Sequence, residues 1–283
     1  MSKRVILLGS KPGSVAALLF MVQQGWDVVE VVATPDQAAW LPGPSLHQVA
    51  SALGIRTVLK QDQLEVVDVD LVISYMFRSL VTQATLNRGR FAINFHAGPL
   101  PEFGGWAFYN LAILEESPDY GCTCHVMDNS FDTGPLVKVR RFSIESSLET
   151  AISLEKKAQK EMGLLFREVM DEFECENEFE IVQQPADQMR YLNKRDFEIL
   201  KRIPLGASKM DADRIARAFW YPPYQIAYYE LANGTRVEVI PEIAKNELAH
   251  GLHESDLTDL LLAFDISTPS SLEFLDLVTK HLK

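Results

Sequence analysis

Three side chains in the middle of this 283-residue chain have the chemistry for acyl transfer. Asn94 and His96 stand two residues apart after an apolar run, and Asp132 lies downstream in an Asp-Thr-Gly segment. Alternate residues of a strand point to the same side, so the amide and the imidazole leave the strand end together. An amide can donate to a developing oxyanion, an imidazole can accept a proton, and a carboxylate can orient or charge that imidazole.

The surrounding sequence predicts that this pair ends a buried strand. Phe91-Ala92-Ile93 is apolar and starts an expected strand over Phe91–Phe95, and Ala97-Gly98-Pro99-Leu100-Pro101 cannot extend it, because proline has no N–H and a fixed φ. Apolar strands alternate with helices before it, which is typical of a mostly parallel sheet covered on both faces. Ligands of such sheets bind beyond the carboxyl ends of the strands. The expected strands are Arg4–Leu8, Asp27–Ala33, Thr57–Leu59 and Leu71–Tyr75, and the expected helices are Ser14–Gln24 and Leu46–Leu53.

The second half of the sequence predicts the end of the catalytic domain and then a smaller, different unit. Two paired strands, Gly121–Met127 and Val137–Phe142, precede an amphipathic helix over Thr150–Glu172. Further on, Asn233-Gly234 is a strong signal for a hairpin turn. We expect a catalytic domain over residues 1–180, a β-rich substrate-side region over 181–245 and a helical tail over 246–283.

The charge, the cysteine content and the apolar runs of the chain argue against several classes of protein. The net charge is −12 and the pI is about 5.0, whereas tRNA-binding proteins carry basic surfaces because phosphate contacts dominate their affinity. Three cysteines fit a reducing compartment, and Cys122-Thr123-Cys124 is expected to supply small buried strand residues, not a metal site. The N-terminus does not have the layout of a signal peptide, and no stretch approaches the roughly 18 apolar residues of a membrane span. We therefore expect a cytoplasmic protein without a membrane partner and, from its acidic charge, without a nucleic-acid partner.

Taken singly, His96 and Asp132-Thr133-Gly134 are compatible with an ordinary turn. Their order and spacing with Gly104-Gly105-Trp106, Tyr120 to Asp128 and Phe131 to Leu136 resemble the folate-dependent formyltransferase family. The resemblance is clear from about residue 70 to residue 145. It implies a Rossmann-like α/β formyltransferase fold, 10-formyltetrahydrofolate as formyl donor and no metal.

By this resemblance, Asn94, His96 and Asp132 are the catalytic trio. Asn94 donates to the oxyanion, an interaction worth about 10²–10³ in rate. His96 either takes the proton of the attacking amine or, when protonated, stabilises charge, and the sequence leaves this choice open. The family often has a Ser-Leu-Leu-Pro-like stretch after the histidine, and the different Ala97 to Pro101 segment puts the substrate-side loop in doubt.

The resemblance also implies ligand contacts near the trio. The expected folate contacts are Tyr75, Met76, Phe77 and Asp128, although Met76 and Phe77 are equally compatible with a core-capping role. An aromatic-proline run could stack on a nucleobase or could simply pack a domain junction. Lysine at a helix start and arginine after a strand suit phosphate. The expected substrate contacts are Ser10, Lys11, Arg78, Trp220, Tyr221 and Tyr224.

Tyr191 to Phe197 and Arg217 to Tyr224 look like segments of the sugar N-formyltransferases. We therefore expect formyl transfer to the amine of a nucleotide-linked amino-deoxy sugar for surface polysaccharides, by a homodimer. Methionyl-tRNA formyltransferase, an enzyme for another small amine such as glycinamide ribonucleotide, a formate-releasing hydrolase and a catalytically inactive ligand sensor are the alternatives.

Overall fold

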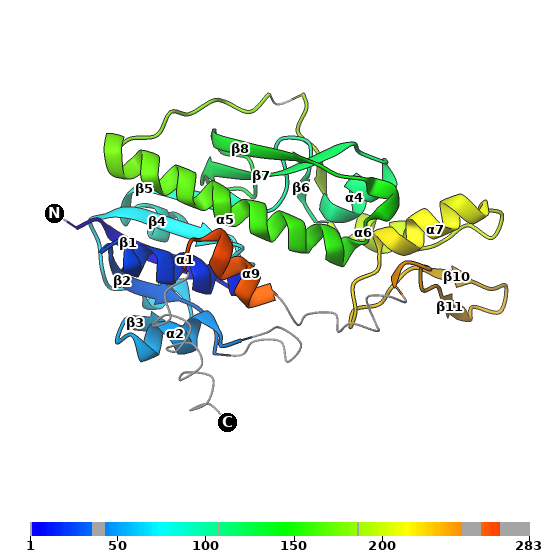
Figure 1. Cartoon of the computed structure of the whole chain (residues 1–283), viewed down its shortest axis with the longest axis horizontal. Coiled ribbons are helices and arrows are strands. Elements are labelled where there is room, and N and C mark those ends of the chain that lie inside the picture. Colours follow the sequence, from blue (N-terminus) through cyan, green and yellow to red (C-terminus); the bar gives the residue numbers. More distant parts are fainter. Residues whose placement is uncertain (1, 36–42, 107, 186, 245–255, 267–283) are drawn as a thin grey trace.

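The computed structural model describes residues 2–35, 43–106, 108–185, 187–244 and 256–266. Its centre is a seven-stranded sheet in the order β3-β2-β1-β4-β5-β7-β8 (Figure 1). The first five strands are parallel, whereas β7 and β8 are antiparallel additions at the β5 edge. The predicted mostly parallel α/β sheet is therefore confirmed. The strands are β1 (Arg4–Gly9), β2 (Asp27–Val32), β3 (Arg56–Val58), β4 (Val69–Tyr75), β5 (Gly89–His96), β7 (Asp119–Val126) and β8 (Leu136–Ser143).

Helices cover the two faces of this sheet unequally. The larger core lies under α1 (Pro12–Gln23), α2 (Leu46–Ala52), α5 (Ala151–Glu176) and α9 (Asp256–Ala263), whose apolar side chains join those of the strands. On the other face a smaller apolar cluster lies under α3 (Gln83–Leu86). Alternation along β1 explains this division, because Val5 and Leu7 enter the larger core while Ile6 and Leu8 enter the smaller one.

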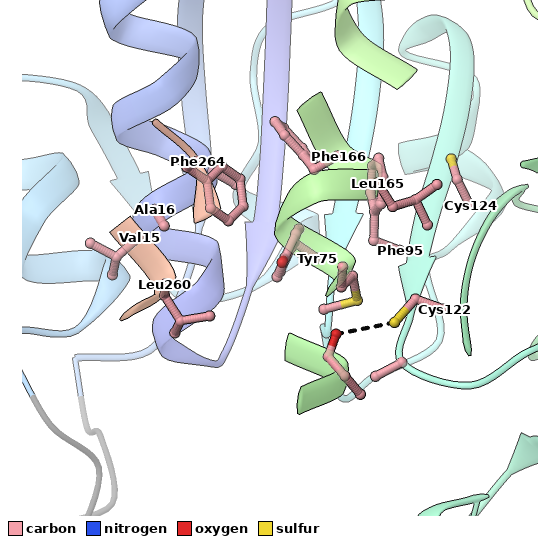
Figure 2. Packing of buried hydrophobic residues seen from close by; sticks show 14 of the residues in the cluster. Val15, Ala16, Tyr75, Phe95, Cys122, Cys124, Leu165, Phe166, Leu260 and Phe264 are labelled. Atoms are coloured by element: carbon pink, nitrogen blue, oxygen red, sulfur yellow. Dashed lines mark hydrogen bonds between the residues drawn. The ribbon is translucent and has the colours of Figure 1, made fainter. Parts of the chain in front are cut away.

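The long helix α5 begins where the sequence predicts. Thr150 is its N-cap and accepts from Ser153 N, and the Ser153 side chain accepts from Thr150 N. Its buried stripe brings Phe166 against Tyr75 and Phe95, with ring centroids 5.8 and 4.8 Å apart (Figure 2). Cys122 and Cys124 are free, fully buried strand residues, as expected, and the Cys122 thiol lies 3.1 Å from the carbonyl of Ala158 (Figure 2).

A smaller group of elements lies at one end of the molecule (Figure 1). It joins the larger part of the molecule, which holds the seven-stranded sheet, through buried polar contacts: Asn110 Nδ2 donates to Ala218 O at 2.6 Å, and Arg217 Nη1 donates to Glu149 O at 3.1 Å. The hairpin predicted around Asn233-Gly234 is confirmed, with Gly234 at φ +80°. The remaining elements are β6 (Gly104–Gly105), α4 (Phe108–Leu114), β9 (Tyr191–Leu192), α6 (Lys194–Leu200), α7 (Lys209–Ala218), β10 (Tyr228–Glu230) and β11 (Arg236–Glu238), with 3-10 turns at Gln61–Gln63 and Ser146–Leu148.

The predicted helical tail over 246–283 lies partly outside the described residues. In its described part, α9 returns to the catalytic half beside α1 and α5 (Figure 1). Phe264, just after α9, is fully buried against Phe20 and Phe166. Within the described residues, no helix is both long enough and apolar enough to cross a bilayer.

Candidate active site

The register of β5 and β7 builds the first half of the site. Asn94 lies opposite His125 in this antiparallel pair, so their side chains share one face. Asn94 Nδ2 lies 3.0 Å from His125 Nε2, and His125 Nδ1 lies 2.9 Å from the carbonyl of Val126. Because a carbonyl only accepts, Nδ1 of His125 carries the proton and Nε2 accepts from the amide. One N–H of Asn94 is thus fixed, and the other can donate to a carbonyl oxygen of a reactant.

His96 ends β5 and is almost fully buried, with 6% of its surface exposed. Its Nε2 donates to the carbonyl of Phe103 at 2.8 Å, which leaves the Nδ1 lone pair of the neutral ring toward Asp132. A Cβ at Gly98 would lie 2.8 Å from Nε2 and 2.7 Å from that carbonyl. The absence of a side chain at Gly98 therefore leaves room for the hydrogen bond between His96 and Phe103.

Asp132 approaches both imidazoles from the loop between β7 and β8. Its Oδ1 lies 3.7 Å from His96 Nδ1 and 3.7 Å from His125 Nε2. Its Oδ2 accepts from the backbone N–H of Gly105 at 2.9 Å. The residue has φ +58°, a left-handed conformation that aspartate tolerates better than most side chains.

The environment keeps the Asp132 carboxylate ionised. Burial by itself would raise its pKa, but the positive charge that His96 and His125 carry when protonated, together with the Gly105 N–H, holds the pKa well below its usual range. A fixed anion beside His96 Nδ1 stabilises the imidazolium that forms when that nitrogen takes a proton.

This arrangement can perform amine acylation. The Nδ1 lone pair of His96 can take the proton of an attacking amine, and Asp132 stabilises the charge that results. The Asn94 amide, oriented by His125, can donate to the oxygen of the carbonyl under attack. The three predicted catalytic side chains thus lie together, on β5 and the β7–β8 loop.

The predicted folate contacts have different environments. Tyr75 is fully buried, and the centroids of its ring and of the stacked Phe95 ring lie 5.7 Å apart. Its ring therefore packs in the core and does not face a pterin. Met76, at φ +53°, and Phe77 follow β4 and are half-buried. Asp128 is exposed and accepts from Ser130 N and Thr133 Oγ1 at 2.9 and 2.7 Å, which braces the loop that carries Asp132.

Several predicted substrate contacts gather where β1 and β4 end. Lys11 Nζ lies 3.0 Å from Glu155 Oε1 and 3.3 Å from Tyr221 Oη, and the ring of Tyr224 packs 5.8 Å from that of Tyr221. The ends of neighbouring strands β1 and β4 carry half-buried Ser10 and exposed Arg78.

Trp220 differs from the prediction. It is 3% exposed and packs with Ile152, Ile226 and Ala244, so its indole fills a domain junction and not a ligand slot. This is the alternative that the sequence left open for the aromatic-proline run.

A pocket of about 240 Å³ opens beside the site. Asp132 is the side chain that this pocket shares with the catalytic trio, so a group bound there would lie next to the carboxylate. The other lining residues are Leu100, Pro101, Gly104, Ser130, Phe131, Thr133, Met189, Arg190 and Tyr191.

Sequence reasoning missed His125 and Gly105. His125 stands in the alternating Cys122-Thr123-Cys124-His125 run, and only the pairing of β5 with β7 places it opposite Asn94. Gly105 contributes a backbone N–H, which no side-chain pattern announces. Knowledge of the strand register would have identified the first, because Asn94 and His125 then share a face.

Known proteins resemble this chain in sequence and in fold. The family described as Formyl transferase matches residues 3–170. The chain is 26% identical over 269 residues to the methionyl-tRNA formyltransferase of Agrobacterium fabrum, covering 90% of this chain and 85% of that protein.

Solved structures share the fold. A 4-N formyltransferase from Francisella tularensis has a TM-score of 0.68 at 22% identity, covering 85% of this chain and 97% of that one. An N-formyltransferase from Helicobacter canadensis, solved with folinic acid and dTDP-3-aminofucose, has a TM-score of 0.68 at 21% identity, covering 82% and 85%.

The family match spans more than half of the chain and includes both strands that carry Asn94, His96 and His125. The loop that supplies Asp132 lies within the same match. An oxyanion donor, a proton acceptor and a fixed carboxylate are the groups that transfer of a formyl group to an amine requires. The chain is therefore an enzyme of the folate-dependent formyl transferase family.

Proposed function

We propose that this enzyme moves the formyl group of 10-formyltetrahydrofolate to the amine of a nucleotide-linked amino-deoxy sugar. The observation that carries the proposal is the gathering of Lys11, Arg78, Tyr221 and Tyr224 where β1 and β4 end. These residues come from distant parts of the sequence, and they combine cations with aromatic rings. That combination suits a nucleoside diphosphate, whose base stacks and whose phosphates need charge.

The position of this cluster also fits a ligand. In the strand order, β1 is flanked by β2 and β4, so the chain changes direction across the sheet at this point. Open α/β sheets bind ligands at such switch points, beyond the strand ends. Burial and the charge of Glu155 raise the pKa of the Tyr221 phenol, and the charge of Arg78 acts on this pKa in the opposite direction. Guanidinium and phenol are therefore within electrostatic range of one another.

The donor half of the reaction rests on the trio and on the residues after β4. Met76, Phe77 and Asp128 remain the proposed folate contacts, since they flank Asn94 and Asp132 in the sheet and the loop. The Helicobacter canadensis enzyme bound to folinic acid and dTDP-3-aminofucose supports both the donor and the acceptor class. Surface polysaccharide synthesis, a cytoplasmic location and a homodimer are parts of the same proposal.

Methionyl-tRNA is the second candidate acceptor, because the similar sequences include methionyl-tRNA formyltransferases at 26–28% identity. The net charge of −12 opposes it, since binding to tRNA depends on neutralising phosphates. The two acceptors predict different ligands for the same protein, so one experiment separates them.

The test is thermal unfolding with folinic acid present, across dTDP, UDP, GDP, CDP and initiator methionyl-tRNA. A ligand at 100 times its Kd stabilises the folded state by about 2.7 kcal/mol, so a true acceptor-side ligand raises the midpoint visibly. We expect one nucleoside diphosphate to do so in wild type and less in Arg78→Gln. The matched control is Arg236→Gln on β11, which should respond like wild type. Stabilisation by the tRNA and by no nucleotide would replace the sugar nucleotide with the second candidate.

A further inference from the structure

The segment between α5 and α6 crosses the catalytic loop. We call residues 181–185 and 187–192 of this segment the strap. At its start, Val182 exchanges two backbone hydrogen bonds of 2.8 Å with Leu136 at the beginning of β8. At its end, β9 runs parallel to β6, where Tyr191 and Leu192 pair with Gly104 and Gly105. The strap therefore spans from the strand after Asp132 to the loop after His96.

Gln184 in the strap holds the backbone of the Asp132 loop. Its Nε2 donates to the carbonyl of Asp132 at 2.9 Å and to that of Gly134 at 2.7 Å. Both N–H groups of this amide are therefore used on either side of Thr133. The loop needs such support, because Asp132 adopts a left-handed conformation and Gly134 packs directly against the Val126 carbonyl.

The strap also fixes the group that holds the carboxylate. Gly104 N donates to Arg190 O at 3.1 Å, and Trp106 N donates to Leu192 O at 2.9 Å. Between these two bonds, the N–H of Gly105 donates to Asp132 Oδ2. One segment thus fixes Asp132 twice, through its carbonyl and through the donor to its side chain.

We propose that Gln184 is a positioning residue of formyl transfer, which holds the Asp132 carboxylate at its distance from His96 and His125. The titratable groups that face Asp132 are His96 on β5, His125 on β7 and Tyr191 on β9. Without the Gln184 N–H groups, two carbonyls of the loop lose their donor and the loop can turn. The carboxylate then leaves the Gly105 N–H and the two imidazoles, which favour its ionised form when they are protonated.

The experiment compares Gln184→Met with Gln183→Met, because Gln183 is the exposed neighbour in the same strap. Carbon NMR of ¹³C-labelled aspartate follows the ionisation of Asp132 in the full chain, without any acceptor. In wild type and Gln183→Met we expect Asp132 to ionise well below the ordinary aspartate range. In Gln184→Met its pKa should rise by about one unit or more, while the Kd for folinic acid stays within about threefold of wild type.

An Asp132 titration in Gln184→Met that coincides with wild type would overturn the proposal. A second measurement needs no variant: in wild type, the side-chain amide protons of Gln184 should exchange with solvent more slowly than those of Gln183, and equal exchange also refutes it. This proposal rests on the enzyme family and not on the sugar. Failure of every nucleotide to bind would leave the Gln184 titration unaffected, so the two ideas fail separately.

Discussion

At the scale of single residues, backbone carbonyls decide which nitrogen of each imidazole carries the proton. Phe103 O accepts a hydrogen bond from His96 Nε2, and Val126 O accepts one from His125 Nδ1. As a result, the other nitrogen of each neutral ring is an acceptor: His125 Nε2 accepts from Asn94, and His96 Nδ1 lies 3.7 Å from Asp132 Oδ1. We propose that His96 takes the proton of the attacking amine, whereas His125 orients Asn94.

The two roles can be separated by substitution. Asn94→Ala removes the proposed oxyanion donor and should lower kcat for formyl transfer by about 10²–10³. His125→Phe keeps that donor but no longer orients it, so we expect a smaller loss of kcat with little change in KM for the donor. The control is His47→Phe on α2, which should keep full activity. Equal losses in His125→Phe and His47→Phe would show that His125 does not orient the amide.

The lowered pKa of Asp132 makes its contribution to stability depend on pH. The folded-state pKa lies below the unfolded value of about 3.9, so the stabilisation is fully present above about pH 4 and is lost as the pH falls through the folded value. Urea unfolding of wild type and Asp132→Asn should therefore show a gap in free energy at pH 5 that narrows toward pH 3. A gap that widens in this range would contradict the assignment.

At the scale of elements, sequence patterns predict most of the sheet, and the family resemblance supplies the trio at the end of β5 and on the β7–β8 loop. Apolar runs separated by helices indicate β1, β2, β4 and β5, because each such strand is buried on both faces. The same patterns miss β6 and β9, since two-residue strands form only where the strap meets the loop after His96. Sequence patterns also miss His125 and Gln184, because the residues that these side chains contact are set by tertiary pairing of segments and not by spacing in the sequence.

Helix α5 is an element whose start was predictable and whose cap can be measured. The Thr150 side chain accepts from Ser153 N at 3.1 Å, within a reciprocal capping box. Thr150→Ala should lower the free energy of unfolding by about 1 kcal/mol, because it leaves a helix N–H without its side-chain acceptor. Thr150→Ser keeps the hydroxyl and should lose much less. Equal losses in urea unfolding would assign the effect to the missing methyl group instead of the cap.

At the scale of the whole molecule, the larger core is closed by a late part of the chain. Phe264 packs against Tyr75 of β4 and Phe166 of α5 (Figure 2). It also packs against Phe20 of α1. The ring also lies so close to α5 that a Cβ at Gly163 would be 2.8 Å from it. The catalytic half therefore shares its core with a segment beyond the hairpin.

This shared core predicts the effect of truncating one ring. Phe264→Ala should lower the free energy of unfolding by about 3–5 kcal/mol, the usual cost of removing a buried aromatic side chain. Leu262→Ala is the matched control, since that side chain is 59% exposed and its loss should cost within about 0.5 kcal/mol. A small effect of Phe264→Ala in urea unfolding would mean that α9 is not part of the cooperative core.

The position of α9 has a consequence for the newborn chain. On a ribosome that adds roughly 5–20 residues per second, Phe20 emerges roughly 10–50 s before Phe264 can be delivered to it. Until Phe264 is made, Phe20, then Tyr75 and then Phe166 lack this covering ring, and such exposed apolar surface is the kind that leads to aggregation. The strands that carry the trio are thus made early, but the apolar core on their sheet is completed only after α9, one of the last helices described, has been made.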